Sequence, residues 1–279
     1  MEKRNKLINW LKKQQHHKTW FVMIFTNPSL YLLNLVKRTL FMGLFLFLIY
    51  ELFIKYFHIS QQTIPSTLHS LIGIVLGLLL VFRTNTAYDR WWEARKIFSS
   101  IHSIYLYIRT RCPNNENIRN SLNSINDLIF RYVSDDVTEE SVKIKEEFIK
   151  EYCNLSEMIA KSDCTPSVHG ILEKKLGDLL DFFTSLERIK DTPIPYSYSF
   201  HIKISIFSYL VTLPFGLFYG LGVWSIPLIM ILFFIIAGID IISSEIENPF
   251  RGDPNDLPIE EFKKENEKYI NGREQKKTD

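Results

Sequence analysis

The 279-residue chain is poor in the features that build catalytic or metal centres. Its three cysteines, Cys112, Cys153 and Cys164, have no CxxC spacing and lie in the polar middle of the chain, so they indicate reduced thiols. The histidines show no metal-ligand spacing with carboxylates, and no serine or cysteine has an evident base. No glycine-rich loop is suited to cradle a phosphate. We therefore expect that the chain is not an enzyme.

Strand-like alternation and a strong charge bias are also missing. Lys and Arg number 33 against 31 Asp and Glu, and the basic residues are balanced by acids or lie beside apolar segments, so no nucleic-acid partner is expected. In the polar middle, apolar residues recur at helical spacing over 118–133, 142–159 and 171–189. These patterns predict an all-α protein.

Long hydrophobic runs are what the chain has in abundance. Residues 1–38 carry eight Lys or Arg against one acid, and the short links after the first and third runs carry neither Lys nor Arg. Under the positive-inside rule, both termini are then cytoplasmic, and the protein is a multi-pass protein of the inner (cell) membrane, in contact with lipid. The predicted membrane spans are 39–57, 66–82, 204–218 and 226–242.

These spans divide the chain into five segments. A basic cytoplasmic segment at the N-terminus is followed by two membrane helices, a helical cytosolic domain, two more membrane helices, and a cytoplasmic tail with an acidic loop. Their bounds are 1–38, 39–82, 83–201, 202–243 and 244–279.

The second span continues into the polar segment without a stop signal. Residues 68–82 contain only His69 and Ser70 as polar residues, whereas residues 82–96 contain charged side chains, two adjacent tryptophans and no Pro or Gly. The sequence therefore predicts one helix that leaves the membrane and continues to about Arg111. The two tryptophans, Trp91 and Trp92, are expected to pack the cytosolic core.

One face of this span carries a regular apolar stripe. Ile74, Leu78 and Phe82 recur every four residues, and several copies around an axis would form collars about 12 Å tall in total. Gly73 and Gly77 form a GxxxG pair that permits close helix packing. Pattern alone leaves two interpretations, a pore lining or an ordinary leucine-rich span.

Polar residues near the spans have several candidate roles. Glu51 and His69 fit an outer vestibule, and His69 fits either a pore mouth or subunit packing. Asp240 lines a wet crevice, pairs with a basic group, or marks the membrane interface. Three arginines are expected to pair with Asp89, Glu93 and acids of the tail: Arg83, Arg90 and Arg95.

Three motifs, in order along the chain, resemble the bacterial branch of the bestrophin family. They are FRTN with YDRWWEAR within 82–95, TPIP at 192–195, and EIENPF at 245–250 with DLP at 256–258. The resemblance covers nearly the whole chain and has the same number of spans. It implies a homopentameric channel with four membrane helices per subunit around a central pore for monovalent ions, either chloride and other anions or, as in some bacterial members, sodium.

The resemblance also implies particular site residues. The hydrophobic neck of the family falls on Ile74, Leu78 and Phe82, and a second, cytosolic aperture is nearest to Ile171. No cofactor is required. A calcium clasp of animal members corresponds to the carboxylates of Asp253 and Asp256 and to oxygens near Glu245 and Asn248, although a Pro-Asn pair interrupts the run of acids. The alternative is a turn that packs the tail.

Two other functions remain open on the sequence alone. The chain is compatible with a membrane-anchored signalling scaffold or with a non-channel transporter, although no inverted repeat supports the latter. A pentameric mass in detergent would favour a channel over both.

Overall fold

The computed structural model describes residues 30–56, 66–135, 138–162, 164–253 and 255–272. Within these ranges the regular structure is helical and contains no strand, so the prediction of an all-α protein is confirmed. The chain forms two compact units. Unit 1 contains residues 1–76 and 204–239, and unit 2 contains residues 77–203 and 240–279.

Four helices are long and apolar enough to cross a membrane, as the four predicted spans require. They are α3 (Leu30–Tyr56), α4 (Ser66–Arg111), α8 (Tyr196–Leu221) and α9 (Ser225–Ile246). Helices α8 and α9 are joined by a 3-10 turn at Gly222–Trp224, where Gly222 has a φ of 55° that favours glycine.

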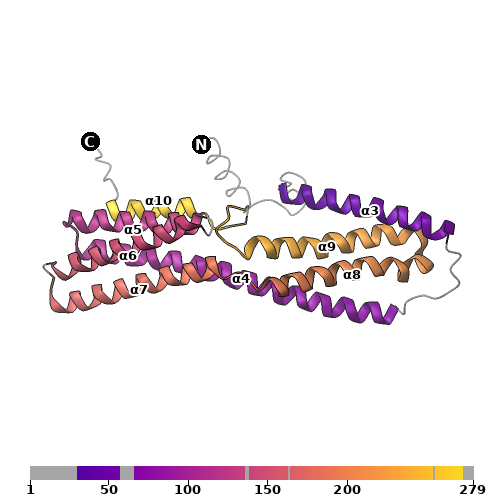
Figure 1. Ribbon diagram of the computed structural model, residues 1–279, viewed down its shortest axis with the longest axis horizontal. Helices are drawn as coiled ribbons and strands as arrows, with labels where there is room; N and C mark the ends of the chain where they lie inside the picture. Colours follow the sequence, from indigo (N-terminus) through magenta and orange to yellow (C-terminus); the bar gives the residue numbers. More distant parts are fainter. Residues whose placement is uncertain (1–29, 57–65, 136–137, 163, 254, 273–279) are drawn as a thin grey trace, which may run out of the picture. The chain divides into compact units, whose positions relative to one another are not determined.

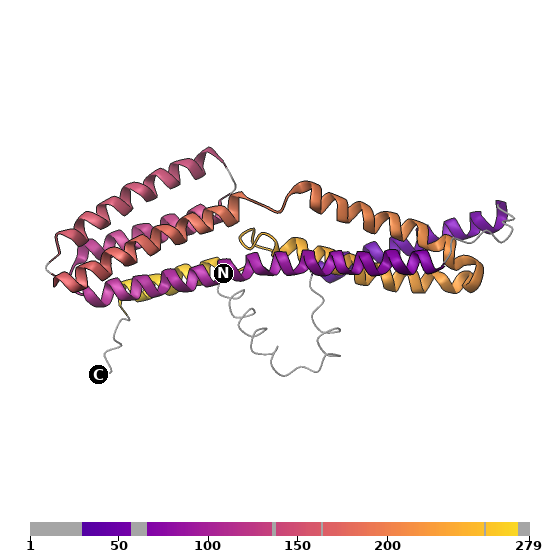
Figure 2. The same ribbon diagram turned by 90° about the horizontal axis from the view of Figure 1, so that it is seen from below.

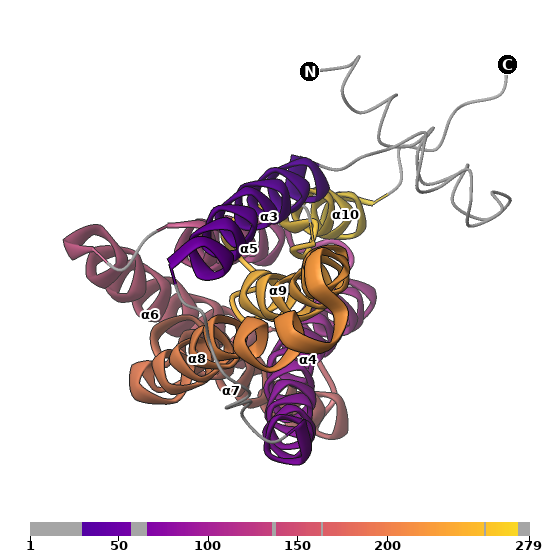
Figure 3. The same ribbon diagram turned by 90° about the vertical axis from the view of Figure 1, so that its right-hand side faces the viewer.

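Unit 1 contains α3, most of α8 and α9, and the beginning of α4, which Figure 3 shows end-on, and close contacts occur at two of its glycines. A side chain added at Gly43 of α3 would collide with Met230 of α9, and one at Gly73 of α4 would come within 2.9 Å of the Tyr209 hydroxyl on α8. Small residues at such contacts let helix backbones approach. A cluster of buried apolar side chains fills unit 1: Leu46, Leu213, Phe218, Ile226 and Ile229.

Helix α4 is continuous over 46 residues, as the absence of helix-breaking residues predicted (Figure 2). At a rise of about 1.5 Å per residue it is about 69 Å long, more than twice the thickness of the hydrocarbon core of a bilayer. The same helix therefore takes part in both units.

Unit 2 is a bundle that contains the C-terminal part of α4 and four further helices (Figure 1). They are α5 (Glu116–Ser134), α6 (Glu139–Ala160), α7 (Pro166–Asp191) and α10 (Ile259–Asn271). Helix α5 begins where the Asn115 side chain accepts a hydrogen bond from the Ile118 amide. Helix α6 begins with a capping box between Thr138 and Ser141, and Pro166 occupies the first turn of α7.

Apolar side chains from α4, α5, α6 and α7 form the core of unit 2, and α10 covers α5. The rings of Phe148 and Phe183 stack at 3.8 Å between centroids. The charged tail after residue 258 contributes a packed helix, because Ile270 is fully buried and Asn266 donates to the Asn126 side chain at 2.9 Å.

Candidate functional site

The apolar stripe predicted on α4 is open to the surroundings of the chain. Ile74, Leu78 and Phe82 are 69%, 57% and 55% exposed, whereas Leu76 and Leu80 on another face are both 3% exposed. One side of the helix thus packs within its own chain, and the stripe is left for lipid, water or another copy. Other apolar residues of the same stretch are also exposed: Leu68, Leu71, Ile72, Val75 and Val81.

Beyond Phe82, the open face of α4 becomes polar. Asn85, Asp89, Trp92 and Lys96 are all exposed. At about 100° per residue, each lies within about 40° of the direction of Leu78 around the helix axis. The exposed stripe therefore runs from apolar to polar along one face of a single helix.

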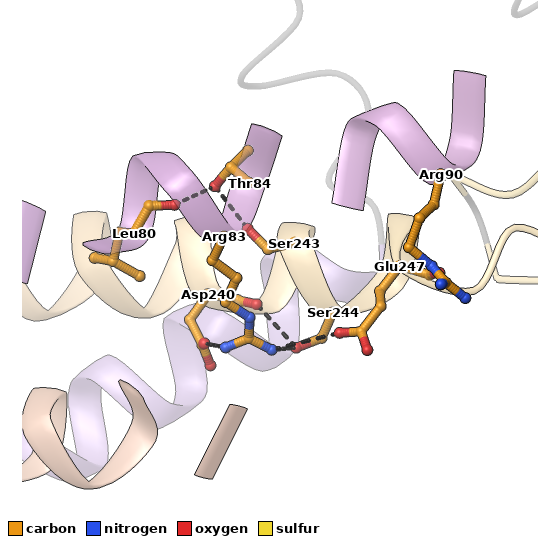
Figure 4. A network of polar contacts seen from close by, with 8 residues as sticks. All are labelled: Leu80, Arg83, Thr84, Arg90, Asp240, Ser243, Ser244 and Glu247. Carbon is orange, nitrogen blue, oxygen red and sulfur yellow. Dashed lines mark hydrogen bonds and ion pairs between the residues drawn. The ribbon is translucent and has the colours of Figure 1, made fainter. Parts of the chain in front are cut away.

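Arg83, the first charged residue after Phe82, does not belong to this open face. Its side chain is 1% exposed and forms an ion pair with Asp240 of α9 (Figure 4). It also donates to Ser244 Oγ at 2.8 Å and lies 3.8 Å from Glu247 Oε2. Of the roles considered for Asp240, the structure shows pairing with a basic group.

A second polar contact joins the same two helices one residue later. The hydroxyls of Thr84 and Ser243 are 2.7 Å apart, and the Thr84 hydroxyl donates to the Leu80 carbonyl at 2.8 Å (Figure 4). Buried polar groups normally occur with such partners, because an unpaired one costs about 1–3 kcal/mol. Polar residues at helical spacing at the end of an otherwise apolar span were the sequence signal for this network: Asp240, Ser243, Ser244 and Glu247.

Arg90 connects the ends of two helices. Its guanidinium donates to the backbone carbonyls of Ile189 at 2.6 Å and Thr192 at 2.8 Å, at the end of α7. It also donates to the Glu247 carbonyl at 3.1 Å, just after α9. The last carbonyls of a helix lack intrahelical donors and carry partial negative charge. A guanidinium there supplies hydrogen-bond donors and a compensating positive charge.

The predicted ion-pair partners of the exit-helix arginines were partly wrong. Arg83 does pair with a tail acid, but Arg90 binds carbonyls, and the Arg95 guanidinium lies 4.6 Å from the centre of the Phe262 ring. Glu93 pairs at 2.7 Å with Arg188 of α7 instead. Local charge spacing does not show which groups another helix will supply.

The two tryptophans after Arg90 differ in their packing. Trp91 packs against the core of unit 2, and its indole N–H donates to the Asn255 carbonyl at 3.0 Å. Trp92 is 45% exposed, so the expectation that both pack the core is wrong for Trp92.

The two polar residues predicted to lie at the outer vestibule, His69 and Glu51, differ in their exposure. His69 is 8% exposed and lies against Tyr209, with 6.1 Å between the ring centres. Its ring nitrogens have no hydrogen-bond partner among the described residues. Neither predicted role of His69, pore mouth or subunit contact, fits a side chain buried inside its own chain, whereas Glu51 is exposed.

Ile171 lies near the beginning of α7 and is 44% exposed. Its neighbour Leu172 and, one turn on, Leu176 are buried in the core of unit 2. The side chain is thus available to a surface outside the subunit, and its role in an aperture stays a prediction.

The acidic loop after α9 is closed by its own hydrogen bonds. Asp256 Oδ2 accepts from the Asp253 amide at 2.8 Å, and Glu245 Oε2 accepts from the Asn255 side chain at 2.6 Å. Asn248 Oδ1 accepts from the Phe250 amide at 3.4 Å.

Burial raises the pKa of Asp256 to about 6, and the nearby carboxylates of Asp253 and Glu245 act in the same direction. No group of three His, Cys, Asp or Glu suited to a metal occurs in the part of the chain that the structure describes. Calcium binding at this loop stays a prediction.

Comparisons with known proteins agree on one family. The model of the family described as "Bacterial/Fungal Bestrophin protein" matches residues 9–110 and 128–271. A voltage-dependent anion channel-forming protein of Nostoc is 32% identical over 87% of this chain and 88% of its own length. A voltage-dependent anion channel-forming protein of Escherichia coli K12 is 22% identical, over 90% and 89%.

Solved structures show the same fold. A bacterial bestrophin homologue from Klebsiella pneumoniae superposes with a TM-score of 0.71 at 18% identity, over 85% of this chain and 96% of that chain. The family and the channel names of these relatives point away from an enzyme, in agreement with the prediction from sequence. The chain is a helical membrane protein that belongs to the bacterial and fungal bestrophin family.

Proposed function

We propose that the chain forms a homopentameric channel for monovalent ions in the cell membrane, with both termini cytoplasmic. In this channel each subunit supplies one α4 helix to a central pore, and Ile74, Leu78 and Phe82 form its hydrophobic neck. The observation that carries the proposal is the open stripe of α4, which is apolar through Phe82 and polar after it. Family membership supplies the second support.

The physical role of the neck follows from its chemistry. Three stacked apolar rings about 6 Å apart would exclude water when narrow, and such constrictions gate ions by dewetting. An apolar ring makes no charge-specific contact. The names of the Nostoc and Escherichia coli relatives support chloride and other anions as the permeant ions, and sodium is the alternative.

Leu78→Ala is the direct test of the neck. The change removes most of the middle ring, so single-channel conductance in planar bilayers should rise. Ile72→Ala is the matched control, because Ile72 is also exposed but points about 120° away from Leu78 around the helix. Equal conductance in wild type and Leu78→Ala would show that the stripe does not form the neck.

Two further measurements test the number of subunits and the identity of the permeant ion. Native mass spectrometry in detergent should give five times the 33.0 kDa subunit mass. Under a sodium chloride gradient, the reversal potential should lie toward the chloride equilibrium potential. A monomer would contradict the pore, and reversal at the sodium potential would establish the alternative ion.

A further inference from the structure

The charges that follow Phe82 on α4 are mostly engaged by other groups of the chain. Six charged side chains lie between residues 83 and 96. Four have partners on other helices or on their own helix: Arg83 with Asp240, Arg90 with helix-end carbonyls, Glu93 with Arg188, and Arg95 with Phe262 and Ser99.

The other two charges are open. Asp89 and Lys96 are exposed, and neither makes a hydrogen bond or an ion pair with any residue that the structure describes. The three arginines between residues 83 and 96 are thus neutralised or directed elsewhere. Among the described residues, the first charge after Phe82 without a partner is a carboxylate.

Helix geometry places this carboxylate in line with the neck. Asp89 is eleven residues after Leu78, which puts it about 20° from Leu78 around the axis and about 16 Å further along. It lies about 10 Å beyond Phe82. The only polar side chain between them on this face is the uncharged Asn85, and Lys96 follows about 10 Å after Asp89.

We propose that Asp89 shifts the charge preference of the pore toward cations at the inner end of the neck, by placing there a negative potential that attracts monovalent cations and repels anions. The inference rests on the proposed function, because it requires that α4 line a pore. An apolar neck makes no charge-specific contact, whereas Asp89, which has no partner among the described residues, can act on the charge of an ion at the exit of the neck. Asp89 thus opposes whatever anion preference the rest of the pathway has.

The expected size follows from Coulomb's law. A unit charge about 10 Å away in water changes the local concentration of a monovalent ion by about two-fold, and physiological salt screens over about 8 Å. In a pore formed by identical subunits, the potentials of their Asp89 carboxylates would add at the axis. We therefore expect Asp89→Asn to lower the sodium-to-chloride permeability ratio by about two- to five-fold at 0.15 M salt, and by more at lower salt.

The test measures reversal potentials of the purified full-length protein in planar bilayers under a sodium chloride gradient. Asp89→Asn should move the reversal potential toward that of chloride, whereas Asp89→Glu should leave it unchanged. Glu116→Gln is the control, because it removes an exposed acid at the start of α5, just after the end of α4, and that end lies about 33 Å along the helix from Asp89. A shift no larger than in Glu116→Gln, or a shift toward sodium, overturns the proposal.

A chemical version of the test works on one folded protein. Asp89→Cys is made together with Cys153→Ser and Cys164→Ser, which leaves only the buried Cys112 as a native thiol. A negatively charged thiosulfonate should restore the wild-type reversal potential, and a positively charged one should move it further toward chloride. Identical effects of the two reagents overturn the proposal.

The experiments distinguish a failure of the proposed channel from a failure of the proposed role of Asp89. Absence of current from the wild-type protein, or no effect of Leu78→Ala, refutes the channel and with it the role of Asp89. A conducting wild type that responds to Leu78→Ala but not to Asp89→Asn refutes the role of Asp89 alone.

Discussion

The buried ion pair between Arg83 and Asp240 allows a quantitative prediction of stability. Asp240→Asn leaves the Arg83 guanidinium 1% exposed, with Ser244 as its hydrogen-bond partner and Glu247 at 3.8 Å. Removing one partner of a buried pair costs about 3–5 kcal/mol, because the other charge remains buried and unpaired. The nearby carboxylate of Glu247 offsets part of this, so we expect a loss of about 3 kcal/mol in the free energy of unfolding.

Removing both charges should cost less than the two single changes added together. In Arg83→Met with Asp240→Asn, no uncompensated charge remains, and the introduced amide is an uncharged polar group that has lost its partner, so the double change should cost about 2 kcal/mol. Arg83→Met alone leaves Asp240, which is 15% exposed and retains contact with solvent, so its cost should be about 2 kcal/mol. The sum of the two single changes should then exceed the double change by about 3 kcal/mol, which is the coupling energy.

The measurement is a double-mutant cycle of unfolding in mixed micelles, followed by tryptophan fluorescence. Glu247→Gln is the control within the same network, because its carboxylate is beyond hydrogen-bond distance of Arg83 and should contribute about 1 kcal/mol or less. Strict additivity of Arg83→Met and Asp240→Asn would refute the reasoning, since it would mean that the two charges do not stabilise each other in the folded protein.

Two other predictions concern the loop after α9 and the contact at Gly43. The folded-state pKa of Asp256, about 6, is above its ordinary value of 3.8, so the folded protein holds this proton more tightly and stability through this group rises as the pH falls from 7 toward 4. Asp256→Asn should therefore remove about 1 kcal/mol of the wild-type difference in unfolding free energy between pH 7.5 and 5.5, and an unchanged pH profile would contradict this. Gly43→Val should destabilise unit 1 by about 1 kcal/mol, measured as a lower Tm, because the added side chain overlaps the end of the flexible Met230 side chain, which must move; Gly77→Val, with open space around Gly77, is the control.

The continuous α4 and the four apolar spans could be predicted because their signals are local. The stretch from Phe82 to Lys96 has no helix-breaking residue, and the stripe of Ile74 and Leu78 follows from helical spacing alone. Which face of α4 is left open by the rest of the chain depends on packing, and only the structure shows it.

The partners of charged residues were much harder to predict. Arg90 binds backbone carbonyls of residues 189, 192 and 247, and a carbonyl has no signature in the sequence because every residue has one. No helix was predicted in the charged tail, yet Ile259, Phe262, Asn266 and Ile270 follow helical spacing and pack α10 against α5. This helical spacing would have sufficed to predict α10 from the sequence.

The ion pair of Arg83 and Asp240 has a consequence for the synthesis of the protein. The two residues are 157 positions apart, so at about 5–20 residues per second the ribosome needs about 8–30 s after adding Arg83 before Asp240 exists. Throughout that interval the second apolar span ends in a guanidinium without its permanent partner. Insertion of the last span therefore supplies the partner of the charge that ends the second span. A chain truncated before residue 240 would retain an unmatched positive charge beside Phe82.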